Sequence, residues 1–178
     1  MTDNIRRIDR VLSEEMALAI IDRCDYGVVS CFDDNGKIFS IPLSLVREDS
    51  CLYIHGAKAG SKTQLYQNGR EVQIVCVADN RPPQLEQDAF FAIQNDAKAL
   101  AQQVFTTKYE SAICMANAYQ VLDEQQKKHA LRLLCEKYCA KYMTAFNTAA
   151  DMYLDKMNIY RFDMKEIIAK SNKSFQAA

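Results

Sequence analysis

The sequence predicts a mainly β domain with peripheral helices, built as a small antiparallel barrel or an α+β sandwich. Six strand-like segments lie along the 178 residues, and an Asn-Gly turn joins the first two into a hairpin. Helical segments stand at the edges of this pattern and in its connections, without the regular strand–helix alternation of a doubly wound parallel sheet. We therefore expect a mostly antiparallel sheet in one domain over residues 1–178.

The composition excludes several classes of function. Apolar residues make up 49% of the chain and charged residues 25%, and the net charge is -1, so nothing indicates a nucleic acid or an anionic membrane as partner. The first ten residues lack the apolar core of a signal peptide. No apolar run approaches the roughly 20 residues that span a bilayer. We expect a cytoplasmic protein.

The cysteines and histidines do not predict a metal site. The seven cysteines are scattered, odd in number and mostly inside apolar runs, which is typical of reduced core thiols. No Cys-x-x-Cys pair marks a zinc site. Cys135 and Cys139, four apart on an expected helix, could supply half of a metal site, but a buried apolar stripe explains them better. Since the two histidines are far apart in sequence, we expect no bound metal.

The chain begins with an expected helix and a hairpin. Ser13 is a favourable N-cap, and the apolar residues after it recur at helical spacing to about residue 24. Strand-like segments at 26–32 and 37–46 flank the turn at Asn35-Gly36.

The second hairpin strand alternates between two faces. One face, which we assign to the core, carries Phe39, Ile41, Leu43 and Leu45. The other face is small and partly polar, and it carries Ile38, Ser40, Pro42 and Ser44. Because proline cannot donate to a ladder, we expect this strand at an edge or irregular at that point.

The later elements follow from similar patterns. Asp123 and Gln126 form a plausible capping box before an amphipathic helix. The remaining expected elements are strand 51–55, a short helix to about 68, strand 71–78, one or two helices in 84–104, strand 108–121, helix 124–142, helix 146–154 and strand 156–163. The helical insertion at about 80–104 interrupts the strands and could be a lid or a dimer arm.

The stretch 53–63, YIHGAKAGSKT, holds the most informative chemistry. Two glycines flank Ala-Lys-Ala, and Ser61-Lys62-Thr63 opens the short helix. Free backbone N–H groups at a helix start favour an anion, and Lys62 adds a positive charge. The hydroxyl groups can donate to phosphate oxygens. The loop therefore suits a phosphate monoester, although a glycine-rich turn with solvated lysines explains it about equally well.

A P-loop is a weaker alternative for the same residues. Gly56 to Thr63 matches G-x-x-x-x-G-K-[ST] except that Ser61 replaces the second glycine. A Cβ is costly there, because that glycine lets the backbone curl around phosphates. The antiparallel pattern also lacks the parallel βαβ setting that the motif needs. An NTPase-like nucleotide binder is thus disfavoured.

His55 and Ser111 are the remaining candidates. His55 directly precedes the loop, where it could contact a ligand or transfer a proton, or simply bond to backbone at a strand end. His129 lies near the start of the amphipathic helix and is expected to be solvated. Ser111 lies mid-strand without a Gly-x-Ser-x-Gly context, so a hydrolase nucleophile is not indicated.

Over about residues 5–145 the chain resembles the flavin-binding split-barrel superfamily of pyridoxamine-phosphate oxidase, and within it the nitroimidazole-resistance branch. The resemblance lies in the order and spacing of several blocks. These are IRRIDRVLSEE, the hairpin with Asn35-Gly36, IPLSLV, YIHGAKAGSKTQL, KYESAICMANAYQV and DEQQKKHALRLLCEKY.

The resemblance implies a six-stranded antiparallel split β-barrel that forms a homodimer with FMN between the subunits. The family's flavin-lining strand corresponds to Ser40, Ile41, Pro42, Leu43 and Ser44. The residues implied on the phosphate side are His55, Ala57, Ser61 and Lys62, with Lys62 as the main charge and His55 also at the reaction site. Ser111 would reach the flavin from the long strand.

The implied function is an FMN-dependent oxidoreductase that passes electrons from reduced flavin to a small electron-poor acceptor, such as the nitroaromatic nitroimidazole. A non-catalytic flavin- or haem-binding module is the alternative. True pyridoxamine-phosphate oxidation is not expected.

The chain departs from the family pattern at three places. Ser61 stands where the superfamily often has arginine or another large residue, and Ala116 stands where a glycine is expected. The segment 79–104 is longer than expected. Because charge-assisted bonds are the strong ones, the loss of one cationic ligand is expected to weaken FMN binding.

Overall fold

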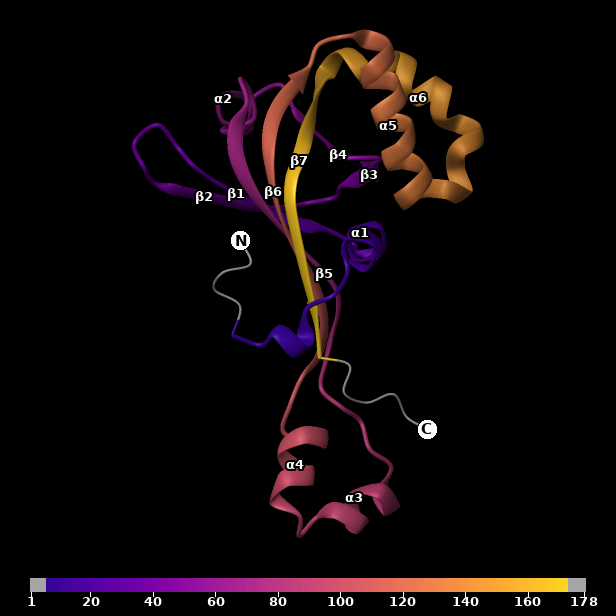
Figure 1. Cartoon of the computed structure of the whole chain (residues 1–178). Helices are drawn as coiled ribbons and strands as arrows, with labels where there is room; N and C mark the ends of the chain where they lie inside the picture. The colour runs from indigo at the N-terminus through magenta and orange to yellow at the C-terminus, as the bar shows by residue number, and fades with distance from the viewer. Residues whose placement is uncertain (1–5, 173–178) are drawn as a thin grey trace.

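The computed structural model describes residues 6–172, so Ile5, the first residue of the resemblance, lies outside the described residues. The chain forms one curled antiparallel sheet with helices around it and a helical arm below it (Figure 1). The sheet order is β2-β1-β5-β6-β7-β4-β3. The strands are β1 (Gly27–Phe32), β2 (Ile38–Leu43), β3 (Val46–Glu48), β4 (Cys51–Ala57), β5 (Arg70–Arg81), β6 (Lys108–Val121) and β7 (Met157–Ser171).

Six α-helices accompany the sheet in the described residues. They are α1 (Glu14–Arg23), α2 (Lys62–Leu65), α3 (Gln87–Ile93), α4 (Ala97–Gln103), α5 (Glu124–Cys139) and α6 (Phe146–Tyr153). Both expected N-caps form: the Ser13 side chain accepts a hydrogen bond from Met16 N, and that of Asp123 accepts one from Gln126 N. In the described residues the Gln126 side chain does not bond back to Asp123 N, so the expected capping box is only half formed. The amphipathic helix ends at Cys139, earlier than expected, and continues as a 3-10 turn.

The prediction of six strands is wrong, because the expected strand 37–46 is two strands. β2 ends at Leu43 on one edge of the sheet, and β3 begins at Val46 on the other edge. Three peptide units span at most about 11 Å, so the sheet curls until its edges nearly meet. No ladder joins β2 to β3 in the described part of the chain, so the sheet stays open. Leu45, fully buried at the crossover, continues the alternation and hides the break.

The last strand is also longer than expected. β7 continues past Asp163 to Ser171, and its second half pairs with the first half of β6, where Glu110 lies opposite Ser171. This pairing joins segments far apart in sequence, so local patterns do not reveal it. The long β6 strand has the expected bounds, 108–121.

The main core lies inside the curl. The predicted core face of β2 is confirmed, since Phe39, Ile41 and Leu43 pack against this cluster and Leu45 is part of it. Tyr66, just after α2, closes one end of the curl with edge-to-face ring contacts to Phe39, Tyr160 and Phe162. Helix α1 contributes its buried face to the same core.

A second, smaller core lies outside the curl. Helices α5 and α6 cover the upper outer side of the sheet there, through Leu131, Phe146, Ala150 and Ile159 among others. The outer faces of β1, β2, β5 and β6 are not covered in this way. That uncovered surface, here named the open sheet face, includes Val28, Val75, Val77, Ile113, Met115 and Ile168.

The segment between β5 and β6 forms the arm, residues 82–107, which carries α3 and α4 (Figure 1). Neither helix contains a buried residue. No helix in the described part of the chain is both long and apolar enough to span a bilayer.

Candidate flavin-binding site

The β4–α2 loop is the centre of the candidate site. It runs from the end of β4 at Ala57 to the start of α2 at Lys62. The backbone N–H groups of Ala59, Gly60 and Ser61 donate to no described residue. Gly60 has φ +98°, and its carbonyl accepts from Thr63 N and Thr63 Oγ1. The loop therefore has a fixed shape and presents free donors at its surface.

Lys62 folds back from α2 across the end of β4. A Cβ added to Gly56 would lie 2.7 Å from Lys62 Cε and 3.3 Å from Lys62 Nζ. No hydrogen bond or ion pair joins the Lys62 ammonium to a described residue. The loop with the free N–H groups thus leads into a lysine whose ammonium has no counter-charge in the described residues and lies against Gly56, and an incoming anion needs both a cation and donors.

His55 lies on β4, next to Gly56, with an exposed side chain. Although the side chain reaches solvent, neighbouring protein atoms displace part of the water around the imidazole. This desolvation, followed by the positive charge of Lys62, lowers the pKa of His55 below 6.5. The imidazole is therefore neutral at neutral pH. It can accept a proton at one ring nitrogen and donate from the other.

Three of the five expected site residues in 40–44 are exposed to solvent. Ser40 and Pro42 lie on β2 and Ser44 in the crossover after it, and Ser40 Oγ lies 2.7 Å from Ser30 Oγ on β1. Ile41 and Leu43 turn towards the core, so they offer the outer face only backbone groups.

The core links β2 to the β4–α2 loop. Tyr66, which follows α2, contacts Phe39 of β2 with ring centroids 6.2 Å apart.

A hollow of about 400 Å³ lies on the open sheet face beside Ser30. It is lined by Ser30, Cys31, Phe32, Ile38, Glu71, Val72, Gln73 and Met115.

Ser111 does not lie beside the loop of its own chain. It pairs with Val77 and Lys170, whereas His55 pairs with Ile159, which in turn pairs with Val121. Ten residues of β6 separate Ser111 from Val121, a distance of roughly 33 Å. Ser111 lies instead on the open sheet face, where it pairs with Val77, whereas Ser40 is level with Met115, four residues further along β6. One chain therefore holds the expected site residues in two separate places.

The P-loop alternative lacks its structural setting. β4 pairs antiparallel with both β3 and β7, so the loop does not connect a parallel strand to a helix. The four-residue α2 is also too short to act as the P-loop helix.

The sequence relationship agrees with this geometry. Residues 13–171 match the sequence profile of the family described as pyridoxamine 5'-phosphate oxidase. The chain belongs to the pyridoxamine 5'-phosphate oxidase family. This match spans every strand of the sheet and the whole β4–α2 loop. No functionally curated protein matches the chain in sequence.

Solved structures share the fold of this family member at low identity. A protein from Bacteroides thetaiotaomicron, described as a candidate 5-nitroimidazole antibiotic resistance protein, is 19% identical with TM-score 0.67 over 90% of this chain and 86% of its own. The FAD and heme binding protein from Mycobacterium smegmatis is 14% identical with TM-score 0.67, over 93% and 74%. The flavocytochrome Anf3 from Azotobacter vinelandii is 14% identical with TM-score 0.62, over 98% and 79%.

In this member of the pyridoxamine 5'-phosphate oxidase family, a flavin phosphate fits the residues present. Lys62 supplies a cation, the hydroxyl of Ser61 and the loop N–H groups supply donors, and Gly56 leaves room for the lysine stem. Within residues 6–172, no group of three or more His, Cys, Asp or Glu side chains is arranged to hold a metal ion.

Sequence reasoning missed the residues that hold the β2–β3 crossover in place. Tyr138 Oη donates to Leu45 O at 2.8 Å and accepts from Leu45 N at 3.0 Å. Lys137 Nζ donates to Leu45 O at 3.0 Å and to Ile21 O at 3.3 Å. One feature of the sequence could have indicated this contact. Tyr138 lies among the apolar residues of α5, and a phenol in such surroundings needs a polar partner.

Proposed function

We propose that this chain forms a homodimer that binds FMN between its two copies and passes electrons from the reduced flavin to a small electron-poor acceptor. The observation that carries the proposal is the unpaired Lys62 ammonium beside Gly56 and the free loop N–H groups. A dianionic phosphate satisfies both the cation and the donors. The membership of the family and the flavin-binding neighbours support a flavin as the source of that phosphate.

The phosphate side of FMN would lie on the β4–α2 loop. Lys62 pairs with the phosphate, while Ser61 Oγ and the N–H groups of Ala59 and Gly60 donate to its oxygens. His55 and Ala57 flank this position on the outer face of β4. Since Ser61 supplies a hydroxyl and no charge, Lys62 carries most of the electrostatic binding energy.

The open sheet face supports dimerisation. Its apolar residues are only partly covered, and Val77 is 44% exposed. At the hairpin end, Phe32 is 62% exposed and Ile38 is 73% exposed. A contiguous apolar sheet face of this kind marks a protein interface, and most soluble oligomers of one chain are two-fold dimers.

A two-fold dimer through this face also explains the position of Ser111. Ser111 and Lys62 lie towards opposite ends of the sheet in one chain. A two-fold axis that crosses the strands at right angles in the middle of the face exchanges those ends, so Ser111 of one copy approaches the β4–α2 loop of the other. The small outer face of β2, with Ser40, Pro42 and Ser44, leaves room for a flat ring system.

The bound flavin supplies the electron transfer, and the protein supplies binding, orientation and a proton. Neutral His55 lies beside the loop and can exchange a proton with the acceptor at its free ring nitrogen. An acceptor of the nitroaromatic class, such as a nitroimidazole, is the one that the similarity to the Bacteroides thetaiotaomicron protein suggests.

A non-catalytic flavin- or haem-binding module is the second candidate. It is favoured by one observation: the exposed His55 side chain bonds to no described residue, and such a histidine can ligate haem iron. Turnover distinguishes the two functions, because a module holds its cofactor without passing electrons to an acceptor.

The decisive experiment is a titration of the purified protein with FMN, FAD and haem, followed by visible absorption and flavin fluorescence. FMN should bind and colour the protein yellow, Lys62→Met should weaken binding at least about tenfold, and Lys141→Met, on the exposed side of the helical layer, should leave it unchanged. Protein that binds no FMN, or Lys62→Met with unaltered affinity, overturns the proposal. With a nicotinamide donor, loss of a nitroimidazole absorbance band separates the oxidoreductase from the module.

A further inference from the structure

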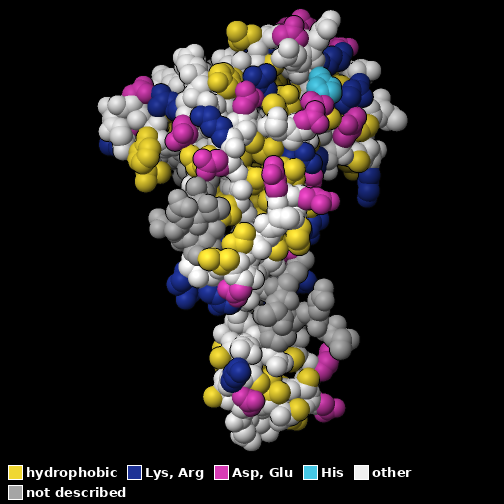
Figure 2. Space-filling view, in the orientation of Figure 1, with side chains coloured by type: hydrophobic (Ala, Val, Ile, Leu, Met, Phe, Trp, Pro, Cys, Tyr) yellow, Lys and Arg dark blue, Asp and Glu magenta, His cyan; other side chains and the backbone are white. Residues whose placement is uncertain are grey.

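The arm exposes a formed apolar surface that no other residue within 6–172 fully covers. Phe90, Phe91 and Phe105 are 37%, 50% and 77% exposed, and Leu85 is 36% exposed. Figure 2 shows several hydrophobic side chains on the surface of the arm, among charged and other side chains. Exposed aromatic groups at this density indicate a contact surface.

The arm has a defined structure. The Asp96 side chain caps α4 by accepting from Lys98 N and Ala99 N, and Leu100 O accepts from both Val104 N and Phe105 N. The rings of Phe90 and Phe91 lie 6.0 Å apart. The surface is therefore ordered before any partner binds, which lowers the entropic cost of docking.

The arm and the β4–α2 loop lie at opposite ends of β5 (Figure 1). β5 starts at Arg70, shortly after α2, and ends at Arg81, where the arm begins. The pair Val75–Ile113 lies in the middle of the open sheet face. From Val75, Arg70 is roughly 16 Å away and Arg81 roughly 20 Å away along the strand.

Under two-fold symmetry these distances bring the arm of one copy to the β4–α2 loop of the other. A two-fold axis that crosses β5 at right angles near Val75 exchanges the two ends of β5, which are almost equidistant from Val75. The root of each arm then lies beside α2 and the β4–α2 loop of the other copy. Within one chain the arm points away from the β4–α2 loop. The arm can therefore reach a β4–α2 loop only when that loop belongs to a second copy.

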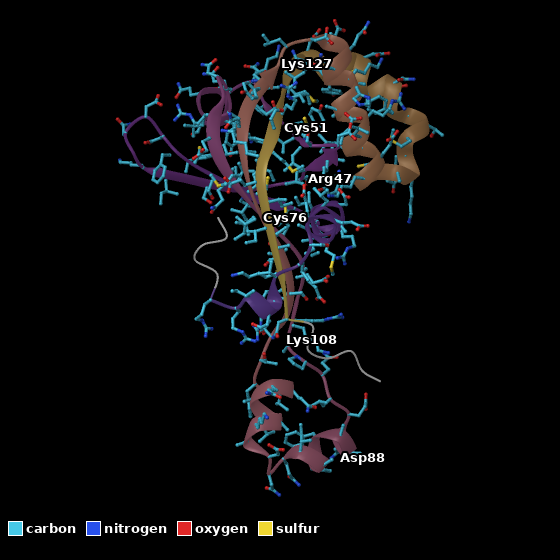
Figure 3. The ribbon with its side chains drawn as sticks, viewed as in Figure 1. Arg47, Cys51, Cys76, Asp88, Lys108 and Lys127 are labelled. Carbon is cyan, nitrogen blue, oxygen red and sulfur yellow. The ribbon has the colours of Figure 1, made fainter. Side chains whose placement is uncertain are left out.

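Beyond its basic root at Arg81 and Lys108, the arm has charges complementary to those of the β4–α2 loop. The arm carries Glu86, Asp88 and Asp96 against the single cation Lys98. Figure 3 shows Asp88 at the outer end of the arm, far from Lys108 at its root. The loop residues 56–63 contain Lys58 and Lys62 and no acidic residue. The acidic excess on the arm and the two lysines of the loop favour contact between arm and loop over contact between two arms, which would bring like charges together.

We infer that each arm docks on the β4–α2 loop of the partner copy and closes the flavin site formed there. The inference rests on the proposed dimeric flavin site and adds a specificity element to it. With the arm in place, Phe90 and Phe91 exclude water from the cofactor and limit the size of the acceptor that reaches it.

A photo-crosslink tests the docking without any cofactor. The photoreactive residue p-benzoylphenylalanine replaces Phe91 in the full chain, and an equimolar mixture with ¹⁵N-labelled chain is irradiated. We expect cross-links between copies, with mixed isotope labels, to peptides that contain residues 56–66. The same group at Tyr142, which is 73% exposed on the helical layer, is the matched control and should give none to that loop. Cross-links only within one chain, or to other surfaces, overturn the inference.

Removal of the arm tests its role at the cofactor. Arg81 and Lys108 are paired neighbours at the end of the β5–β6 ladder, so Asn-Gly can replace residues 82–107 as a two-residue turn. The shortened dimer should still bind FMN, while iodide quenches the flavin fluorescence about threefold more strongly than in the full chain. Equal quenching overturns the lid role. A full chain that binds no FMN defeats the proposed function instead, and the cross-link result still decides where the arm docks.

Discussion

The Lys62 side chain lies directly against Gly56, with its Cε 2.7 Å from the position that a β-carbon on residue 56 would take. This contact keeps the ammonium at the end of β4, close enough for its charge to act on His55. The glycine at residue 56 leaves room for this position of Lys62, and its backbone φ is not positive.

Gly56→Ala should therefore weaken FMN binding without unfolding the protein. The new methyl group displaces the flexible end of Lys62, and we expect the FMN dissociation constant to rise about tenfold, or about 1.4 kcal/mol. Flavin fluorescence titration measures this change, and thermal unfolding checks the fold. In a Lys62→Met background, Gly56→Ala should not raise the dissociation constant further, because the ammonium that it would displace has already been removed. An additive loss in the double variant would show that Gly56 acts by another route.

The His55 imidazole should titrate below its ordinary range. Partial burial and the Lys62 charge lower its pKa, so Lys62→Met should raise the pKa of His55 towards 6.5, and inorganic phosphate bound at Lys62 should raise it as well. Histidine C–H signals in NMR spectra measure both effects, and His55→Gln assigns the resonance. A pKa that ignores both changes would place the Lys62 charge away from His55.

The same shift makes a prediction about stability. Because the pKa of His55 is lower in the folded state, the unfolded chain binds more protons just below pH 6.5, and stability falls as the pH drops through that window. Urea unfolding should show that His55→Gln loses less stability than the native protein between pH 7 and about pH 5. Identical pH profiles for the two proteins would contradict the shift.

Tyr138→Phe should destabilise the β2–β3 crossover. The Tyr138 hydroxyl bonds to both Leu45 O and Leu45 N, and its loss leaves partly buried backbone groups without this partner. We expect a cost of about 1–2 kcal/mol in the free energy of unfolding, measured with urea. Tyr142→Phe is the control, since its hydroxyl bonds to no described residue and should contribute almost nothing.

Local patterns predicted the parts of the fold that depend on neighbouring residues. The caps at Ser13 and Asp123, the hairpin turn and the bounds of β6 follow from short stretches of sequence. The break between β2 and β3 does not, because alternation reports which face a side chain takes and not which strand lies beside it. Leu45 stays buried through the crossover, so the alternation continues across it.

The candidate site was predictable only in part for the same reason. Residues 55–62 form one continuous segment, so the loop could be identified from its glycines and lysine. Ser111 and Ser40 lie on strands whose mutual positions depend on long-range pairing. The sequence could not show that Ser111 lies near the opposite end of the sheet from Lys62, nor that Lys62 folds back over Gly56.

The composite nature of the site is tested most directly by complementation between two defective copies. Lys62→Met and Ser111→Tyr are prepared as separate proteins, each confirmed as a dimer that binds FMN poorly, and are then co-expressed with different tags. If Lys62 of one copy and Ser111 of the other share a site, the mixed dimer regains one intact site and binds one FMN per two chains. Mixed dimers that bind no more FMN than either parent would contradict a site built from both copies.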